Sequence, residues 1–404
     1  MGARVLRPEG KGFIFLDSHP AGCAATVDAM IEEAAGDRAL PGTANPDGPR
    51  TLVIGSSAGY GLAAAVTGLF GFGARVIGLC YERPATARRS ASAGWYRTAA
   101  LAGRAAGAGL LFGAVNGDCF DPAVRAGVLD RAAAALGQVD VLIYSVAAPR
   151  RTDPQSGAVY HSAVKPIGAA YRTRNLAIAD GVVLRDSVHE PATDAEIDAT
   201  VKVMGGEDWT DWGNDLAARG MLAPGFQTVA LTYVGSELTA PIYRQGTIGR
   251  AKDHLEATAA KLTGGVLAAA DGKAATCVHC AAVTQSSLAI PGISLYLSLL
   301  RAVAGDAAES AVRQSARLWN YLTAGSGITD GLGRLRLDDW ELAADVQAAL
   351  GQRWQASTEE LAGGLADLDW FRRQIWQLYG FDVPGIDYSQ PVETDLSWPA
   401  WPQR

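Results

Sequence analysis

The sequence is poor in charge and has no long uninterrupted hydrophobic run. Charged residues make up 19% of the 404 residues and the formal net charge is -7, which argues against general nucleic-acid binding because that needs a basic surface. The 49% hydrophobic content also excludes a disordered or coiled-coil chain. The longest apolar stretch, residues 290–300, is too short to span a bilayer, and we see no signal-peptide pattern. We therefore expect a cytoplasmic protein without a membrane partner.

Cysteine is scarce, which argues against a disulfide framework. The five cysteines stand at positions 23, 80, 119, 277 and 280. Cys277 and Cys280 form a C-x-x-C motif, but no second pair of ligands accompanies it and the stretch is typical of a buried strand. We expect both thiols to be small core residues, and we expect no metal site.

Glycine is abundant, and its most informative cluster is the segment GSSAGYG, Gly55–Gly61. An apolar strand precedes it, a helical stretch follows, and a second apolar strand over 75–81 ends at Glu82. This pattern is the dinucleotide-binding unit, because glycine lets the backbone approach a pyrophosphate and the helix N-terminus attracts its charge. Glu82 would bind ribose hydroxyls and repel a 2′-phosphate, which favours NADH. Three arginines close behind, at 83, 88 and 89, leave the opposite preference open.

The alternation of strands and helices continues along the chain. We expect strands over 109–115, 140–148, 227–233 and 274–283, and a helix over 122–136. Ligands bind beyond the carboxyl ends of such strands, so Val146, Ala147 and Thr284 are expected along the cofactor. Asp118 either binds the adenine amine or forms a turn.

The pattern predicts an α/β fold with a Rossmann-type, doubly wound, mainly parallel sheet in one extended domain, residues 1–404. A loop rich in proline and glycine, 41–50, ends an N-terminal extension. The expected parts are the extension 1–50, the dinucleotide-binding core 51–148 and 227–304, a lid or substrate insertion 149–226, and a helical C-terminal part 305–404.

The insertion and the late apolar stretch each allow two interpretations. Long insertions at this sheet edge usually build a lid or pocket, and this one contains Trp209 and Trp212. Arg150 and Arg151 either face the phosphates of a thioester carrier or solvate a loop. The apolar stretch 288–300 fits a buried helix or an acyl-chain wall. No apolar seam or heptad is evident, so we expect a monomer.

The segment Leu231–Glu256 holds the candidate acid–base residues Tyr233, Tyr243 and Lys252. On one continuous helix, nine residues turn through about 900°, which would put Tyr243 and Lys252 on opposite faces. Two intervening glycines predict instead that the helix begins near Thr247, with Tyr243 in the loop before it. A buried core tyrosine and a solvated lysine are the alternatives.

Several motifs together resemble the FabV-type enoyl-acyl-carrier-protein reductases and the similar trans-2-enoyl-CoA reductases. The motifs are HPAGC from His19, GSSAGYG, Tyr81-Glu82, AGWY from Ala93, YSVAAPRRTDP from Tyr144, GRLRLDDWEL from Gly333, and PIYRQGTIGRAK, which contains the family's Y-x8-K spacing. The resemblance covers nearly the whole chain. It implies NADH-dependent reduction of the C2=C3 double bond of enoyl-CoA or enoyl-acyl-carrier-protein substrates, with hydride delivered to C3.

The resemblance also implies roles for individual residues. Tyr243 is similar to the catalytic tyrosine that stabilises and protonates the enolate. Lys252 is similar to the lysine that contacts NADH and lowers the pKa of the tyrosine, and Tyr233 to the substrate-contacting tyrosine. The implied cofactor contacts are Gly55, Ser56, Ser57, Ala58, Gly59, Tyr60, Tyr81, Glu82, Asp118, Cys119, Val146, Ala147, Lys252, Ala282, Val283 and Thr284.

Two other functions remain open at this point. A short-chain-type carbonyl reductase or alcohol dehydrogenase would use the same tyrosine on a C=O group. A non-catalytic NADH-binding protein is the other. A flavin is conceivable, although we find no second nucleotide motif.

Overall fold

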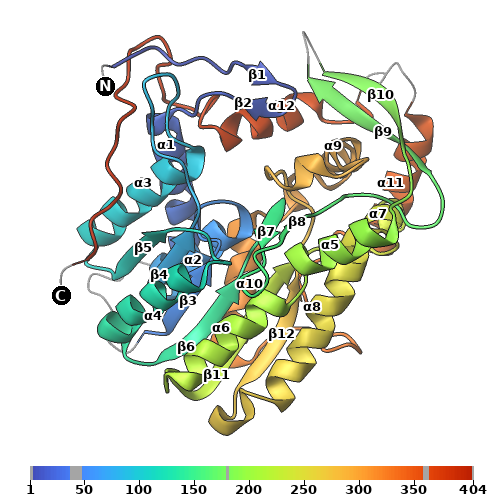
Figure 1. The fold of residues 1–404 in the computed structure, drawn as a ribbon. Coiled ribbons are helices and arrows are strands. Elements are labelled where there is room, and N and C mark those ends of the chain that lie inside the picture. Colours follow the sequence, from blue (N-terminus) through green and yellow to red (C-terminus); the bar gives the residue numbers. More distant parts are fainter. Residues whose placement is uncertain (1–2, 37–47, 179–181, 358–363, 403–404) are drawn as a thin grey trace.

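A seven-stranded sheet forms the centre of the computed structural model, which describes residues 3–36, 48–178, 182–357 and 364–402 (Figure 1). Every strand in it runs parallel to its neighbours, in the order β13-β12-β11-β6-β3-β4-β5. The winding reverses between β3 and β6, where ligands of such sheets bind. The strands are β3 (Arg50–Ile54), β4 (Arg75–Cys80), β5 (Phe112–Asn116), β6 (Val139–Tyr144), β11 (Leu222–Thr232), β12 (Lys273–Val278) and β13 (Leu335–Arg336).

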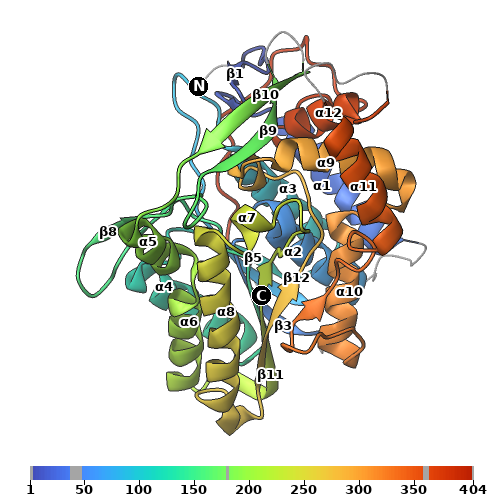
Figure 2. The same ribbon diagram turned by 90° about the vertical axis from the view of Figure 1, so that its right-hand side faces the viewer.

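Helices cover both faces of the sheet because its strands are apolar on both sides. In β3, Val53 belongs to the hydrophobic core on one face, while Leu52 and Ile54 belong to the core on the other. Figure 2 shows the two helical layers with the sheet between them. The first layer is α1 (Pro20–Ala35), α2 (Gly59–Phe72), α3 (Ala93–Gly107) and α10 (Ala311–Ala324); the second is α4 (Pro122–Leu136), α6 (Glu207–Ala218) and α8 (Thr247–Gly264).

A third apolar core lies beyond the carboxyl ends of the strands, at the top of Figure 1. It contains both Tyr233 and Tyr243. The elements at this end are the hairpins β1 (Gly10–Lys11)–β2 (Ile14–Phe15) and β9 (Tyr171–Ile178)–β10 (Val182–His189), and the helices α7 (Ala240–Tyr243), α9 (Ile293–Ala304), α11 (Ala344–Ala356) and α12 (Leu368–Leu378).

The last residues of the chain lie along the first helical layer. Trp95 in α3 donates its indole N–H to the Leu396 carbonyl at 2.7 Å, and the Tyr96 hydroxyl donates to the Thr394 carbonyl at 2.7 Å. The indole of Trp398 donates to the Ala114 carbonyl in β5 at 3.2 Å. The tail therefore packs along α3 and reaches the edge strand β5 of the sheet.

The expected strands and the α/β class are confirmed, and the helix predicted over 122–136 is α4. The interval 149–226 differs from a simple lid. It contains the hairpin β7 (Arg150–Thr152)–β8 (Val159–His161), β9–β10 and α5 (Asp194–Met204), but also α6. Trp209 and Trp212 of α6 are fully buried against the sheet. This helix is the crossover between β6 and β11, so the two tryptophans are core residues.

Strand β13 is the strand of the central sheet that the sequence does not predict. Only two of its residues pair with β12, in the middle of a turn-rich stretch, which is too short for a periodic signal. Most of the loop expected at 41–50 lies outside the described residues. Within the described part of the chain, no helix is both long and apolar enough to cross a membrane.

Candidate active site

The glycine-rich turn lies between β3 and α2, at the switch point of the sheet. Gly55 has φ 91°, and a Cβ on it would lie 1.9 Å from the Ser145 carbonyl oxygen. A Cβ on Gly61 would lie 2.0 Å from the Gly55 carbonyl. Helix α2 begins at Gly59 after Ala58, which provides no side-chain cap. The first N–H groups of this helix are thus available to an anion such as a pyrophosphate.

Glu82 follows β4, and hydroxyl groups hold its carboxylate. Ser57 donates to Glu82 Oε1 at 2.6 Å, and the Ser92 hydroxyl donates to Oε2. Gly94 makes room for this carboxylate, since a Cβ there would lie 2.0 Å from Oε1. The structure therefore places Glu82 beside the glycine-rich turn, where a ribose would be expected, and leaves the neighbouring Tyr81 ring 71% exposed.

The other predicted cofactor contacts also follow strand ends. Asp118 comes after β5 and accepts the Phe120 N–H at 3.0 Å, which matches the turn-forming alternative. Cys119 is partly buried beside it. Thr284, after β12, comes within 3.5 Å of the position that a Cβ on Gly59 would take. The remaining predicted contacts, Val146, Ala147, Ala282 and Val283, stand just after β6 and β12.

A cavity of about 550 Å³ opens between the β1–β2 hairpin and these strand ends. Its walls include Tyr81, Glu82, Gln285, Leu288 and Tyr379. The cavity is large enough for part of a cofactor or for a substrate arm. It extends from Glu82 to the segment that follows Thr284.

The predicted start of the helix near Thr247 is confirmed, but Tyr243 lies in a short helix and not in a loop. Helix α8 begins at Thr247, and Tyr243 ends the separate short helix α7. The two tyrosine rings pack edge to face with their centroids 4.6 Å apart. Both are buried, at 6% and 9% exposure. The Tyr243 hydroxyl has no hydrogen-bond partner among the residues that the structure describes.

The side chain of Lys252, on α8, points toward the tyrosine pair. Its Nζ donates to Thr232 Oγ1 at 2.7 Å and lies 6.0 Å from the centroid of the Tyr243 ring. Burial, with help from Arg244, lowers the pKa of Lys252 to about 8. The expected lowering of the Tyr243 pKa does not occur. Burial and the nearby Glu341 raise the pKa of Tyr243 instead, so this tyrosine keeps its proton until a base forms beside it.

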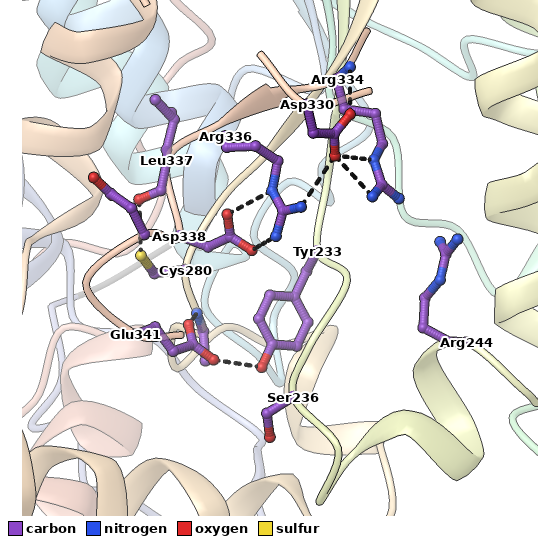
Figure 3. A network of polar contacts seen from close by, with 12 residues as sticks. Tyr233, Ser236, Arg244, Cys280, Asp330, Arg334, Arg336, Leu337, Asp338 and Glu341 are labelled. Atoms are coloured by element: carbon purple, nitrogen blue, oxygen red, sulfur yellow. Dashed lines mark hydrogen bonds and ion pairs between the residues drawn. The ribbon is translucent and has the colours of Figure 1, made fainter. Parts of the chain in front are cut away.

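Sequence reasoning missed Glu341, a fully buried carboxyl beside the tyrosines. Figure 3 shows its bond to Tyr233, in which the tyrosine hydroxyl donates to Oε1 at 2.8 Å. Burial raises the pKa of Glu341 to about 7. The stretch DDWEL reads locally as a helix start, and no local signal marks Glu341 as a partner of residues far away in the chain.

A cation network surrounds this corner of the site. Arg244, directly after Tyr243, pairs with Glu256 at 3.1 Å, and Arg334 pairs with the same carboxylate oxygen at 3.1 Å. Arg336 binds Asp338 through two nitrogens, at 2.8 and 2.7 Å (Figure 3). The two pairs with Glu256 link Arg334, next to β13, and Arg244, next to Tyr243, to the middle of α8.

A second buried network lies between α4, α6 and the end of β6. Asp208, 2% exposed, accepts the Tyr144 hydroxyl at 3.1 Å and pairs with Arg125 at 3.3 Å. Arg125 also pairs with Asp215 at 2.6 Å. Burial raises the pKa of Asp208 to about 7.

The two arginines of the insertion differ, and Arg151 matches neither of the alternatives left open for it. Arg150 is exposed, whereas Arg151 is 4% exposed and pairs with Glu207 at 3.0 Å. Arg151 thus ties α6 to the β7–β8 hairpin and is not available to a carrier phosphate.

The fold and the site together define a dinucleotide-binding enzyme of the doubly wound α/β class, with a tyrosine and a lysine at the carboxyl edge of its sheet. Comparison with known proteins narrows this class. A family model described as the trans-2-enoyl-CoA reductase catalytic region matches residues 89–322. Models described as the NAD(P)H binding domain of trans-2-enoyl-CoA reductase and as the enoyl reductase FAD binding domain match residues 5–87 and 329–392.

Similar proteins extend over the full chain. An enoyl-acyl-carrier-protein reductase (NADH) of Streptomyces avermitilis is 52% identical, covering 98% of this chain and 100% of that protein. A trans-2-enoyl-CoA reductase (NADH) of Clostridium perfringens is 41% identical over 96% and 99% of the two chains. The crystal structure of Treponema denticola trans-2-enoyl-CoA reductase in complex with NAD has a TM-score of 0.89 at 35% identity, covering 98% and 100%. This chain belongs to the trans-2-enoyl-CoA reductase family, as the motifs indicated.

The segment matched by the FAD-binding model does not present a flavin site. Its described residues, 329–357 and 364–392, contain β13, α11 and α12 but no strand–glycine turn–helix unit. Phe371, Ile375 and Phe381 fill its inner face. Protein donors occupy both oxygens of Glu341, its buried carboxylate beside the tyrosines. We therefore derive no step through a flavin.

Proposed function

We propose that the protein reduces the C2=C3 double bond of trans-2-enoyl thioesters with NADH. The observation that carries the proposal is the Tyr243 hydroxyl, which lies beside Lys252 without a hydrogen-bond partner among the described residues. It lies at the edge of the sheet where the glycine-rich turn and Glu82 are suited to a dinucleotide. The names of the relatives support both the substrate class and the cofactor.

The cofactor fits the residues at this edge. The turn Gly55–Gly61 would hold the pyrophosphate, and Glu82 with Tyr81 would hold the adenosine. Lys252 would hold the nicotinamide ribose, with Ala282 to Thr284 beside it. When bound, NADH supplies the hydride that is added to C3 of the substrate.

Tyr243 then acts on the other end of the conjugated system. Negative charge develops on the thioester oxygen as C3 is reduced, and the Tyr243 hydroxyl donates a hydrogen bond or its proton to that oxygen. The Lys252 ammonium, charged below a pH of about 8, adds positive potential at the same place. Protonation at C2 completes the saturated thioester. Tyr233 packs against Tyr243 and contacts the substrate.

We propose one functional unit over residues 1–404. The substrate lid in this unit is formed by part of the insertion 149–226, namely β7–β8, β9–β10 and α5. Helix α6 instead belongs to the helical layer that packs on the sheet. The third apolar core beyond the strand ends supports an acyl-binding role for α9, whose buried residues include Leu295 and Leu299. We further propose that the protein is a monomer, which sedimentation of the purified protein tests, and that it acts in the cytoplasm, which fractionation of cells tests.

The test is NADH consumption by the purified protein, followed at 340 nm. We expect turnover with an enoyl-CoA such as crotonyl-CoA, with the same acyl group on acyl carrier protein, or with both, and the ratio of the two rates assigns the carrier. NADPH in parallel tests the role of Glu82. Turnover of simple ketones without turnover of enoyl thioesters would contradict the proposal and favour a carbonyl reductase.

A further inference from the structure

Glu341 joins three separate parts of the site through its two oxygens. Oε1 accepts the Tyr233 hydroxyl at 2.8 Å and the Tyr296 hydroxyl of α9 at 2.7 Å. Oε2 accepts the backbone N–H of Ala281, after β12, at 2.6 Å. Glu341 itself is 0% exposed. A carboxyl in this position bonds the loops after β11 and β12 to one helix of the substrate end.

The partners fix the direction of these bonds. A backbone N–H can only donate, so Oε2 must accept. Tyr296 receives a bond from Gln347 Nε2 at 3.3 Å, so its own proton is directed to Glu341. An ionised Glu341 has no proton to give, and Tyr233 must therefore also donate to it. The proton of Tyr233 is thus engaged, whereas the Tyr243 hydroxyl has no partner among the described residues.

We propose that Glu341 is a positioning residue that decides which tyrosine donates to the substrate oxygen, by holding the Tyr233 proton away from it and leaving Tyr243 as the donor. This inference rests on the function proposed above. It explains why two adjacent buried tyrosines, with ring centroids 4.6 Å apart, take different roles.

Protonation of Glu341 reverses the assignment. Because Oε2 faces the Ala281 N–H, the added proton sits on Oε1, where the Tyr233 and Tyr296 oxygens are the possible acceptors. Tyr296 already accepts the Gln347 N–H, so the proton goes to the Tyr233 oxygen and releases the Tyr233 proton for another acceptor, which we propose is the substrate oxygen. The raised pKa of Glu341, about 7, places this reversal in the neutral range. The titratable groups that face Glu341 from the elements packed against it are Tyr60, Tyr233, Tyr243, Cys280, Tyr296 and Asp338.

The substitution Glu341→Gln imposes the reversed state at every pH. Its carbonyl must face the Ala281 N–H, so its NH₂ group faces the tyrosine oxygens and donates to them. The side chain keeps its volume, so packing around it is conserved. Tyr233 then presents its proton to the substrate, as in the protonated wild type.

The experiment measures kcat with an enoyl thioester in the Tyr243→Phe background, where the normal donor is absent. Glu341→Gln added to Tyr243→Phe is expected to raise kcat about tenfold or more above Tyr243→Phe alone, because a second donor becomes available. Removing the Tyr233 hydroxyl from that double variant should abolish the gain. A merely structural role for Glu341 would lower the activity further.

Asp208→Asn in the Tyr243→Phe background is the matched control. It alters another buried carboxyl that accepts a tyrosine hydroxyl, away from the tyrosine pair, and it is expected to bring no gain in kcat.

A pH series on Tyr243→Phe alone tests the same idea with Glu341 intact. Its residual kcat should rise as the pH falls from 8 to 6, and the rise should be clearly smaller when Tyr233→Phe is added, because only the charging of Lys252 then remains. A flat profile for Tyr243→Phe, or a double variant with Glu341→Gln that is folded by circular dichroism but no more active, overturns the inference. A wild type that consumes no NADH with any enoyl thioester overturns the proposed function, and the inference with it.

Discussion

Asp208 and Glu341 are both buried carboxyl groups with raised pKa values, yet they differ in whether a cation is paired with them. Asp208 has its cation within its own network, since Arg125 binds both it and Asp215. Glu341 has no cation among the described residues and is held by neutral donors. The cation on its side of the sheet, Lys252, instead binds a threonine hydroxyl.

The difference separates a structural network from a reactive one. An arginine that is paired with carboxylates helps to hold the folded structure together, and its positive charge is neutralised so that it no longer acts on distant groups. Lys252 makes no ion pair within the described residues, so its charge remains directed at Tyr243, where the substrate oxygen is expected. We infer that the protein tolerates an uncompensated carboxyl and an uncompensated ammonium at one end of its sheet because the site needs both.

The largest expected effect is a difference in kcat between removing the hydroxyl of Tyr243, near Glu341, and removing that of Tyr144, on Asp208. Tyr243→Phe removes the proposed donor to the developing enolate and should lower kcat about 10²- to 10³-fold, with NADH binding retained. Tyr144→Phe, on Asp208, should leave kcat near the wild-type value. Steady-state kinetics and NADH fluorescence titration check both, and a Tyr243→Phe enzyme with normal turnover would remove the assignment.

The next largest effect concerns Lys252, the cation beside Tyr243. Lys252→Met should raise the KM for NADH about 10- to 100-fold, because a charge-assisted contact to the cofactor is lost. In the wild type, kcat/KM for NADH should fall as the pH rises through about 8, where Lys252 loses its charge. If Lys252→Met shows the same decline above pH 8, another group causes it.

Asp208→Asn tests the structural side of the comparison. We expect the free energy of unfolding to fall by about 1–3 kcal/mol, because Asn pairs poorly with Arg125 while Asp215 retains its bond. Urea denaturation measures this loss. The folded variant should keep its kcat, and a large decrease would mean that this network also shapes the cofactor site.

The smallest effect is the dependence of stability on pH. Both carboxyls have folded pKa values of about 7, above the value of about 4 in an unfolded chain. The native state therefore binds more protons than the unfolded state between these limits, so these groups stabilise it below about pH 4 and that stability is lost as the pH rises through about 7. Each group should contribute up to about 1 kcal/mol per pH unit near pH 6. Urea midpoints at several pH values should give a shallower slope for Asp208→Asn and for Glu341→Gln than for the wild type.

The sequence predicted those features that local pattern determines. The segment GSSAGYG with its flanking strands located the switch point, and the glycines on either side of Thr247, Gly246 and Gly249, located the start of α8. The meeting of Tyr243 and Lys252 followed from that start. The burial of Trp209, Trp212 and Leu216 on α6 was also available from their helical spacing, but the irregular sequence around them favoured a lid.

The features that it missed depend on distant contacts. Glu341 is bonded to Tyr233, 108 residues away, and to Ala281, 60 residues away. Neither partner alters the local pattern around DDWEL, which resembles an ordinary helix start. The pKa of Tyr243 was missed for a similar reason, because its burial depends on α7, α9 and the third core together.

The path of the tail has a consequence for synthesis of the protein. Residues 394–398 hydrogen-bond α3 and β5, elements made about 300 residues earlier. Until residues 394–398 have been synthesised, the Trp95 indole and the Tyr96 hydroxyl lack these two acceptors, although Tyr96 still accepts the Ala91 N–H. We therefore expect a nascent chain stalled before residue 394 to leave this face of α3 uncovered and to remain a substrate for chaperones.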